Sequence, residues 1–269
     1  MDSGGRGAGV HGVAVTVAGA VATVTLDRGE RLNAQTPHTW AALREVGRSL
    51  PGTVRVVVVR GEGRAFSAGL DRAAFTPDGI PGALGLVELA ALPSAGAEDV
   101  IHGYQEAFSW LRRPDLVSVA AVQGVAIGAG CQLALACDLR VLAEDALLSL
   151  PEPTLGLVPD LGGTAPLVET VGYSRALEIC LTGRRVGAAE ALTLGLATLV
   201  VPRAQLSSAV EDLVAALLAA PRDAVVETKA LLLGASGRSR DEQEAAERAA
   251  QVRRLHDLAS ATGAAPPPD

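Results

Sequence analysis

The feature that most constrains this chain is a glycine-punctuated segment, residues 124–138, which follows an apolar run at residues 117–122. The apolar run is typical of a buried strand, and the end of the segment continues as a helix of small side chains. Between them, Gly124, Gly128 and Gly130 permit a turn that another part of the backbone can approach closely. A strand that ends in such a turn and opens a helix directs free N–H groups at whatever lies above it. This arrangement suits an anion or a developing oxyanion.

A second segment has the same character. Residues 54–60 form an apolar run that predicts a strand, and a glycine-rich turn follows at residues 61–71. We expect each turn to supply one N–H donor to a shared oxygen, with the amides of Leu70 and Ala129 as the candidates. Removing one such donor can lower a rate about a hundredfold or more. The alternative is that these glycines only permit tight strand-to-helix turns.

Two carboxylates could supply general acid/base chemistry. Glu152 lies between two prolines at the end of a predicted strand, and Asp160 follows a proline eight positions later. A residue before proline is restricted to extended backbone, so the Glu152 carboxylate is expected in a stiff loop. Apolar neighbours would raise both pKa values toward a useful range. The alternatives are a solvated loop carboxylate for Glu152 and a helix-capping role for Asp160.

Other catalytic arrangements are weaker. Ser67, Asp160 and His256 occur in the chain order of some hydrolases, but few strands precede the serine and the histidine lies in a charged terminal helix. The glycine turn near residue 61 is too short a match for a dinucleotide fingerprint. The four histidines are scattered, which makes a metal site improbable.

Composition narrows the class of protein. A net charge of −7 argues against a general nucleic-acid binder, and no apolar run is long enough to span a membrane. Cys131, Cys137 and Cys180 lack metal-ligand spacing, so we expect buried free thiols in a cytoplasmic protein. Residues 1–10 are expected to form a flexible lead without a signal peptide.

The order of predicted elements indicates an α/β core followed by a helical region. Strands alternate with helices over residues 11–200, and helices dominate residues 201–260. A disordered tail is expected at residues 261–269. Residues 73–97 predict a mobile loop or a weak helix, and Asp99 is the expected cap of the helix that follows.

Three motifs bring these features together: residues 63–71, 124–132 and 151–164 strongly resemble the enoyl-CoA hydratase/isomerase (crotonase) family. Residues 181–202 resemble the family's next landmark, and the similarity extends over about residues 11–260. The resemblance implies a crotonase-like spiral of ββα units with a C-terminal helical trimerisation region. It further implies an acyl-CoA thioester substrate, a homotrimer or hexamer, and no cofactor besides the coenzyme A of the substrate. No metal, nucleic acid or membrane is expected as a partner.

The resemblance also assigns roles to single positions. The amides of Leu70 and Ala129 resemble the family's oxyanion hole, and the backbone of Ala68 resembles the part that meets the adenine. The other positions that match substrate-binding residues are Gly69, Asp71, Gly128 and Gln132. The positions that match the approach to coenzyme A are Arg31, Arg64 and Lys229.

Two positions bear on the reaction. Hydratases of the family hold water between two glutamates; here Glu152 matches the second, but Gln132 replaces the first. Asp160 matches an acidic position that isomerases use to move a proton. We therefore expect isomerisation of a 3-enoyl-CoA to the 2-enoyl form, with Asp160 and Glu152 as proton carriers. The alternatives are hydration by Glu152 with Gln132 orienting the water, and a non-catalytic acyl-CoA-binding oligomer.

Overall fold

The computed structural model describes residues 11–76 and 78–261, and its centre is a six-stranded sheet with the order β1-β2-β3-β4-β6-β9. Only the β1–β2 hairpin is antiparallel; the other neighbouring strands run parallel. The buried strands predicted over residues 54–60 and 117–122 are confirmed. The strands of this sheet are β1 (Val13–Ala18), β2 (Val21–Leu26), β3 (Val56–Gly61), β4 (Val117–Val122), β6 (Leu139–Ala143) and β9 (Leu199–Val201).

A small second sheet carries the order β5-β7-β8. It consists of β5 (Val125–Ile127), β7 (Leu147–Ser149) and β8 (Val186–Gly187). The sequence pattern predicted β7, but it treated β5 as part of the glycine turn and missed β8. Strands of two or three residues are too short to show a periodic pattern of apolar side chains. They form because they pair with segments that are distant in the sequence.

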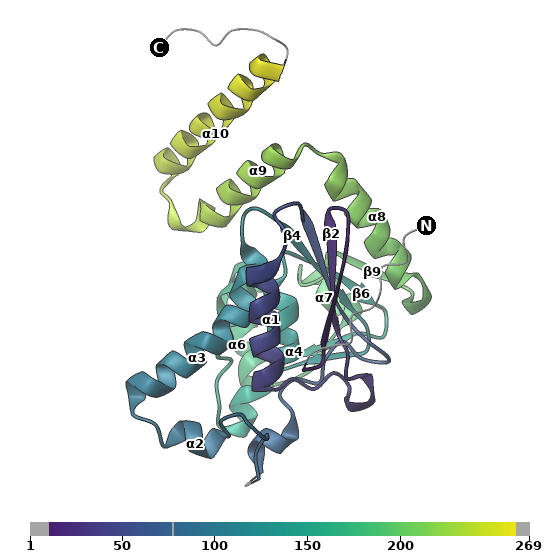
Figure 1. The fold of residues 1–269 in the computed structure, drawn as a ribbon, viewed down its shortest axis with the longest axis vertical. Helices are drawn as coiled ribbons and strands as arrows, with labels where there is room; N and C mark the ends of the chain where they lie inside the picture. The colour runs from purple at the N-terminus through teal and green to yellow at the C-terminus, as the bar shows by residue number, and fades with distance from the viewer. Residues whose placement is uncertain (1–10, 77, 262–269) are drawn as a thin grey trace.

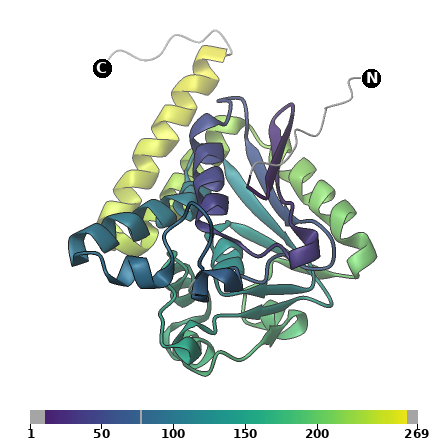
Figure 2. The same ribbon diagram turned by 60° about the horizontal axis from the view of Figure 1, so that its bottom comes forward.

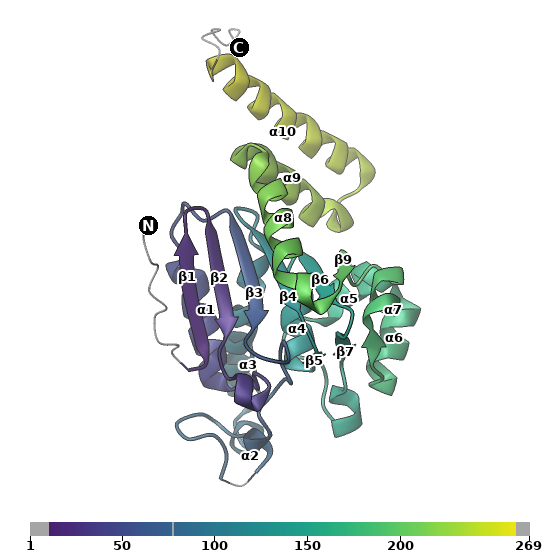
Figure 3. The ribbon, with the colours of Figure 1, turned by 90° about the vertical axis from the view of Figure 1, so that its right-hand side faces the viewer.

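Helices cover both faces of the main sheet. On one face lie α1 (Pro37–Ser49), α3 (Ser94–Ser109) and α4 (Ala129–Ala136), and on the other lies α8 (Leu206–Ala219) (Figures 1 and 3). Viewed from the end near α2 (Leu86–Ala90), α3 lies beside α1 (Figure 2). The remaining helices are α5 (Thr164–Val171), α6 (Tyr173–Thr182), α7 (Ala188–Thr193), α9 (Arg222–Gly234) and α10 (Arg240–Ala261).

The alternation of side chains along β3 explains the two-sided packing. Val57 and Val59 join the larger core beneath α1, α3 and α4, whereas Val56 and Val58 face α8. Successive side chains of a strand point to opposite faces, so a strand that is covered on both sides is apolar throughout. This is the reason that the β3 and β4 segments were recognisable from the sequence.

The last two helices lie at one end of the sheet. α9 lies across the amino ends of β4 and β6, whereas α10 projects away from the sheet, at the opposite end of the molecule from α2 (Figures 1 and 3). Arg253 pairs with Glu227 at 2.7 Å, and Arg254 pairs with Asp223 at 3.4 Å, so ion pairs join the two helices. Among the described residues, no helix combines the length and the apolarity that a membrane span requires.

Several local predictions need correction. Asp99 does not cap a helix, because α3 already begins at Ser94, after Pro93. The region predicted as a mobile loop or a weak helix contains a 3-10 turn, Arg72–Phe75, and the short helix α2, so the weak-helix alternative is confirmed there. Glu152 opens another 3-10 turn rather than lying in an extended loop.

The ends of the chain were predicted separately. Helix α10 continues to Ala261, one residue into the predicted tail. The rest of that tail, residues 262–269, and the predicted flexible lead, residues 1–10, lie outside the described residues. The three cysteines are free thiols, two of them buried and Cys180 partly so.

Candidate active site

The two glycine turns lie side by side beyond the carboxyl ends of β3 and β4. Ser67 donates its N–H to the Val125 carbonyl at 2.9 Å, and Ile127 donates to the Ser67 carbonyl at 3.0 Å. A β-carbon on Gly69 would overlap the Ile127 carbonyl oxygen and lie 3.4 Å from the Ala129 nitrogen. Only glycine permits this approach, and it brings the two predicted donor peptides next to each other.

The two candidate donors are unpaired. Within the described part of the chain, no acceptor lies within hydrogen-bond distance of the N–H of Leu70 or of Ala129. Ala129 is the first residue of α4, where the helix dipole favours negative charge. Gly128 has a φ of +53° and turns the chain into that helix. Two adjacent free donors can stabilise a developing oxyanion.

A buried polar network supports the first turn from below. The Ser67 hydroxyl donates to the Asn33 carbonyl at 2.8 Å and accepts from the Gln35 amide at 3.0 Å. The Gln35 oxygen in turn accepts from the Trp40 indole at 2.8 Å. Sequence analysis missed Asn33 and Gln35, although two amide residues just before a helix were a possible signal. Their hydrogen bonds join residues that lie about thirty positions apart in the sequence, and spacing along the chain does not reveal such pairs.

This network excludes the serine-hydrolase alternative. Ser67 is fully buried, and its hydroxyl is already held by the turn. His256 is an exposed residue of α10, which projects away from the core (Figure 1). The chain order that suggested a hydrolase therefore brings no base to the serine.

Glu152 lies beside the second turn. A β-carbon on Gly128 would be 3.4 Å from the Glu152 Oε1 atom, and this oxygen accepts a hydrogen bond from the Gln132 amide at 2.9 Å. The Oε2 atom is buried without a partner among the described residues. Burial raises the pKa of the carboxyl, and the charge of Asp160 raises it further. A carboxyl of this kind can exchange a proton with a bound ligand.

Gln132 connects both carboxylate segments. Its side chain is buried, and its oxygen accepts the N–H of Leu161 at 2.8 Å and of Gly163 at 3.3 Å. Its nitrogen donates to Glu152. The amide therefore holds the Glu152 side chain and the turn after Asp160 in one arrangement.

Asp160 lies between Glu152 and α3. Its carbonyl accepts a hydrogen bond from the Gln105 side chain of α3 at 2.7 Å. Burial raises the pKa of its carboxyl. The charge of Asp160 also raises the pKa of Glu152 on one side and of Tyr104 on the other, in each case after burial as the larger cause. The Asp160 carboxyl thus acts electrostatically on both Glu152 and Tyr104.

The remaining positions near the first turn differ in role. Ala68 is partly buried and donates its N–H to the Leu32 carbonyl at 2.8 Å. Arg31 and Arg64 are exposed. Asp71 pairs with Arg28 at 2.9 Å and caps a 3-10 turn through its other oxygen. The Asp71 carboxylate is thus bonded to other residues of the chain, whereas the side chains of Arg31 and Arg64 remain accessible.

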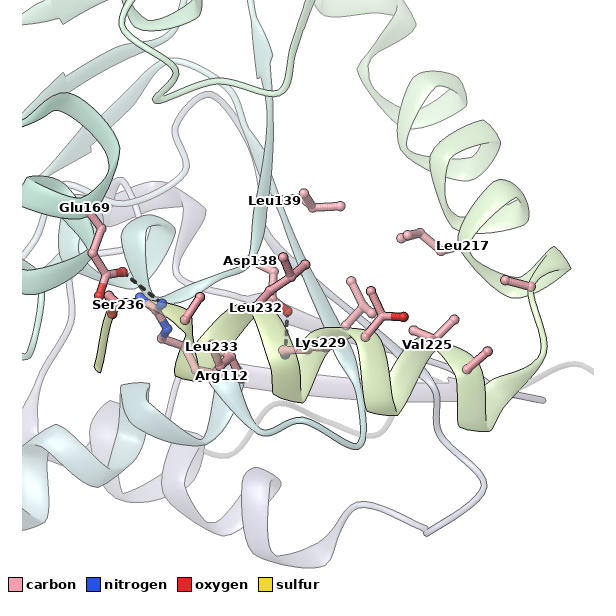
Figure 4. A pocket seen from close by; sticks show the side chains of 15 residues that line it. Arg112, Asp138, Leu139, Glu169, Leu217, Val225, Lys229, Leu232, Leu233 and Ser236 are labelled. Atoms are coloured by element: carbon pink, nitrogen blue, oxygen red, sulfur yellow. Dashed lines mark hydrogen bonds and ion pairs between the residues drawn. The ribbon is translucent and has the colours of Figure 1, made fainter. Parts of the chain in front are cut away.

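The structure places Lys229 elsewhere. Its ammonium is buried and donates to the Asp138 carboxylate and to the Leu116 carbonyl, each at 2.7 Å. It lies in a groove of about 850 Å³ between α9 and the amino ends of β4 and β6 (Figure 4). If the Lys229 ammonium left this pair, the buried Asp138 carboxylate would lose its partner. The prediction that Lys229 binds coenzyme A is therefore not supported within this chain.

A resident metal ion has no obvious ligands. Among residues 11–76 and 78–261, no group of three or more histidines, cysteines, aspartates or glutamates is placed to hold one.

Comparison with known proteins identifies the family. The family model described as "Enoyl-CoA hydratase/isomerase" matches residues 16–264, and the chain belongs to this family. A crystal structure from Thermobifida fusca YX, provisionally named as an enoyl-CoA hydratase and bound to acetoacetyl-CoA, is 50% identical to this chain. It superposes with a TM-score of 0.89 over 92% of this chain and 96% of its own. The fold is therefore that of the crotonases.

More distant relatives carry similar names. An enoyl-CoA hydratase structure from Bacillus anthracis is 26% identical, with a TM-score of 0.77 over 95% of this chain and 98% of its own. A protein of Dictyostelium discoideum named "Probable enoyl-CoA hydratase, mitochondrial" is 33% identical over 186 residues. That alignment spans 68% of this chain and 61% of the relative.

Proposed function

We propose that this protein is an enoyl-CoA isomerase that converts a 3-enoyl-CoA into the 2-enoyl form. The observation that carries the proposal is the carboxyl pair Glu152 and Asp160 near the unpaired N–H groups of Leu70 and Ala129, with Gln132 bonded to Glu152 and to the backbone that follows Asp160. The pair can move a proton, and the two N–H groups can stabilise the enolate that forms when the proton leaves. The Thermobifida fusca structure with acetoacetyl-CoA supports a CoA thioester as the ligand.

The binding mode follows from the same groups. The thioester oxygen accepts the N–H groups of Leu70 and Ala129. Arg31 and Arg64 are exposed cations on the side of the first turn, and guanidinium groups suit the phosphates of coenzyme A. The backbone of Ala68 adjoins them and is the proposed contact for the adenine.

The proposed reaction uses the two carboxyls in sequence. Glu152 lies next to the Ala129 turn and so removes a proton from C2, beside the thioester carbon, through its unpaired Oε2 atom. The electron pair spreads onto the thioester oxygen and C4. Asp160, farther toward α3, enters protonated and delivers its proton to C4, and the double bond moves from C3–C4 to C2–C3. Proton transfer from Glu152 to Asp160 restores the starting state.

Hydration of a 2-enoyl-CoA is the second candidate, because the relatives are named as hydratases. That reaction requires two groups that hold the attacking water. The Gln132 oxygen accepts two backbone N–H groups and its nitrogen donates to Glu152, which disfavours a water-holding role for this amide.

Nuclear magnetic resonance in heavy water tests both candidates. A 3-enoyl-CoA and a 2-enoyl-CoA are each incubated with the protein. Migration of the double bond with deuterium at C2 or C4 and no hydroxyl product is the expected result. A 3-hydroxyacyl product would replace the isomerase with the hydratase. Binding without any change in either thioester would favour a non-catalytic acyl-CoA-binding protein.

We also propose that the protein assembles as a homotrimer or hexamer. Leu232 of α9 and three residues of α10 present apolar side chains to solvent in the single chain, and such a patch is typical of an interface. The residues of α10 are Val252, Leu255 and Leu258. Light scattering coupled to size-exclusion chromatography would measure the mass, and a monomer at micromolar concentration would contradict the proposal.

A further inference from the structure

The N–H of Leu70, one of the two candidate oxyanion donors, belongs to a peptide group that Gln35 holds from the opposite side. The Gln35 N–H donates to the Gly69 carbonyl at 2.7 Å, and the Gln35 carbonyl accepts the N–H of Asp71 at 2.7 Å. Gln35 and Leu70 thus form a short parallel bridge. The C=O and N–H of a planar trans peptide group point in opposite directions. The bond to the Gly69 carbonyl therefore directs the Leu70 N–H away from Gln35.

This peptide group needs to be held, because a glycine precedes it. Gly69 has a φ of +86°, and glycine adopts several backbone conformations at similar cost. A rotation of the peptide group between Gly69 and Leu70 would place the carbonyl oxygen where the N–H now points. Negative charge would then develop beside an acceptor instead of a donor. The Gln35 N–H opposes this rotation, because its bond to the Gly69 carbonyl would be lost.

The side chain of Gln35 is itself fixed by two hydrogen bonds. It is fully buried, its oxygen accepts the Trp40 indole N–H at 2.8 Å, and its nitrogen donates to the Ser67 hydroxyl at 3.0 Å. The same hydroxyl oxygen accepts the N–H of Gly69 at 3.2 Å. Gln35 thus acts on both peptide groups that flank Gly69. Burying an amide costs more than burying an apolar side chain, so packing alone does not account for a glutamine at this position.

We propose that Gln35 is a positioning residue that holds the Leu70 N–H toward the thioester oxygen. It acts through its own backbone N–H and, by way of the Ser67 hydroxyl, through its side-chain amide. A carbonyl that accepts a hydrogen bond also makes the N–H of the same peptide group a stronger donor. This inference rests on the proposed function, because it takes the Leu70 N–H as an oxyanion donor.

The carbonyl carbon of a bound thioester reports on the oxyanion donors without catalysis. Hexanoyl-CoA has no double bond to move, and its carbon-13 resonance at C1 shifts downfield when hydrogen bonds polarise the carbonyl. Gln35→Leu should lose up to about half of the shift seen in the native protein, because the Ala129 donor remains. Ser67→Ala should lose a smaller part of it, because the backbone bond from Gln35 to the Gly69 carbonyl is kept.

Ser118→Ala is the matched control for Ser67→Ala. Both serines are fully buried, and each hydroxyl donates to a backbone carbonyl and accepts a backbone N–H. Ser118 lies near the amino end of β4, away from the candidate site. Both substitutions should destabilise the fold, but only Ser67→Ala should move the carbonyl resonance. Ser67→Ala removes a single oxygen atom, so it keeps the inference testable if Gln35→Leu does not fold. A native resonance in Ser67→Ala would overturn the inference.

Turnover separates this inference from the proposed function. With 3-hexenoyl-CoA, Gln35→Leu should lower kcat about tenfold with little change in KM, because the donor acts on charge that develops in the transition state. The double variant with Ser67→Ala should lose little more, because both side chains act on the same turn. A native resonance in folded Gln35→Leu would overturn the inference, whatever kcat does, and would leave the isomerase intact. If no enoyl-CoA is isomerised but the resonance depends on Gln35, the isomerase fails and the positioning role stands.

Discussion

Buried polar groups at the two ends of the parallel sheet differ in whether they have hydrogen-bond partners within the chain. At the amino ends of β4 and β6, Lys229 bonds to Asp138 and to a carbonyl, and the same carboxylate accepts the N–H and the hydroxyl of Ser118. At the carboxyl ends, the Glu152 Oε2 atom lacks a partner among the described residues, as do the two candidate oxyanion donors. A buried group that is satisfied within the chain serves the structure, whereas one that is left unsatisfied indicates a ligand.

The largest expected effect comes from neutralising the carboxyls at the carboxyl ends. Asp160→Asn and Glu152→Gln should each lower kcat about a thousandfold, because an amide cannot carry the proton. Neither substitution should destabilise the fold, because each removes a carboxyl that burial already penalises. Steady-state isomerase assays and thermal unfolding of the same samples measure both. Unchanged turnover in Asp160→Asn would show that this aspartate is not a proton carrier.

The opposite pattern is expected at the amino ends. Lys229→Met should lower the free energy of unfolding by about 3–5 kcal/mol, because the buried Asp138 charge loses its partner. The turnover of the folded fraction should stay the same. Arg240→Met, which breaks an exposed pair with Glu244, is the control and should leave the denaturation curve nearly unchanged. A loss of coenzyme A affinity without loss of stability would instead restore Lys229 as a phosphate contact.

A smaller effect is expected from disturbing the oxyanion donors. Gly69 has a φ of +86°, and a β-carbon there would overlap the Ile127 carbonyl. Gly69→Ala should therefore displace the Leu70 N–H and lower kcat about a hundredfold, with little change in KM. Gly19→Ala is the control, because Gly19 also has a positive φ but has open space around it in the β1–β2 turn. Equal losses in both variants would mean that the effect is general strain.

The smallest effect is a shift in pH dependence. The base must be ionised, so exchange of the C2 proton should fall about tenfold per pH unit below the pKa of Glu152. Because burial raises this pKa, the fall should begin above the ordinary value of 4.5. Asp160→Asn should leave this fall in place, because Asp160 is protonated and neutral in the proposed reaction. Proton exchange followed by NMR measures this step alone, and a fall that moved to lower pH in Asp160→Asn would show that Asp160 is ionised when Glu152 acts.

The raised pKa values also have a consequence for stability. A carboxyl whose pKa is higher in the folded state stabilises the fold only at low pH. Its contribution is present below the pKa of the unfolded chain and is lost as the pH rises through the folded value. The carboxyls of Glu152 and Asp160 are thus expected to contribute less to the stability of the fold at neutral pH than at low pH.

The sequence by itself determined the longer buried strands, the glycine turns and the candidate carboxylates of this protein. Apolar runs and turn glycines are local signals, and this is why β3, β4 and the turns at residues 61–71 and 124–130 could be predicted. Only the tertiary structure decided which polar groups are satisfied. Gln132 bonds to a carboxylate 20 positions away and Lys229 to one 91 positions away. Partners so far apart in the chain meet only through packing, so their pairing separates a structural lysine from a proposed proton carrier.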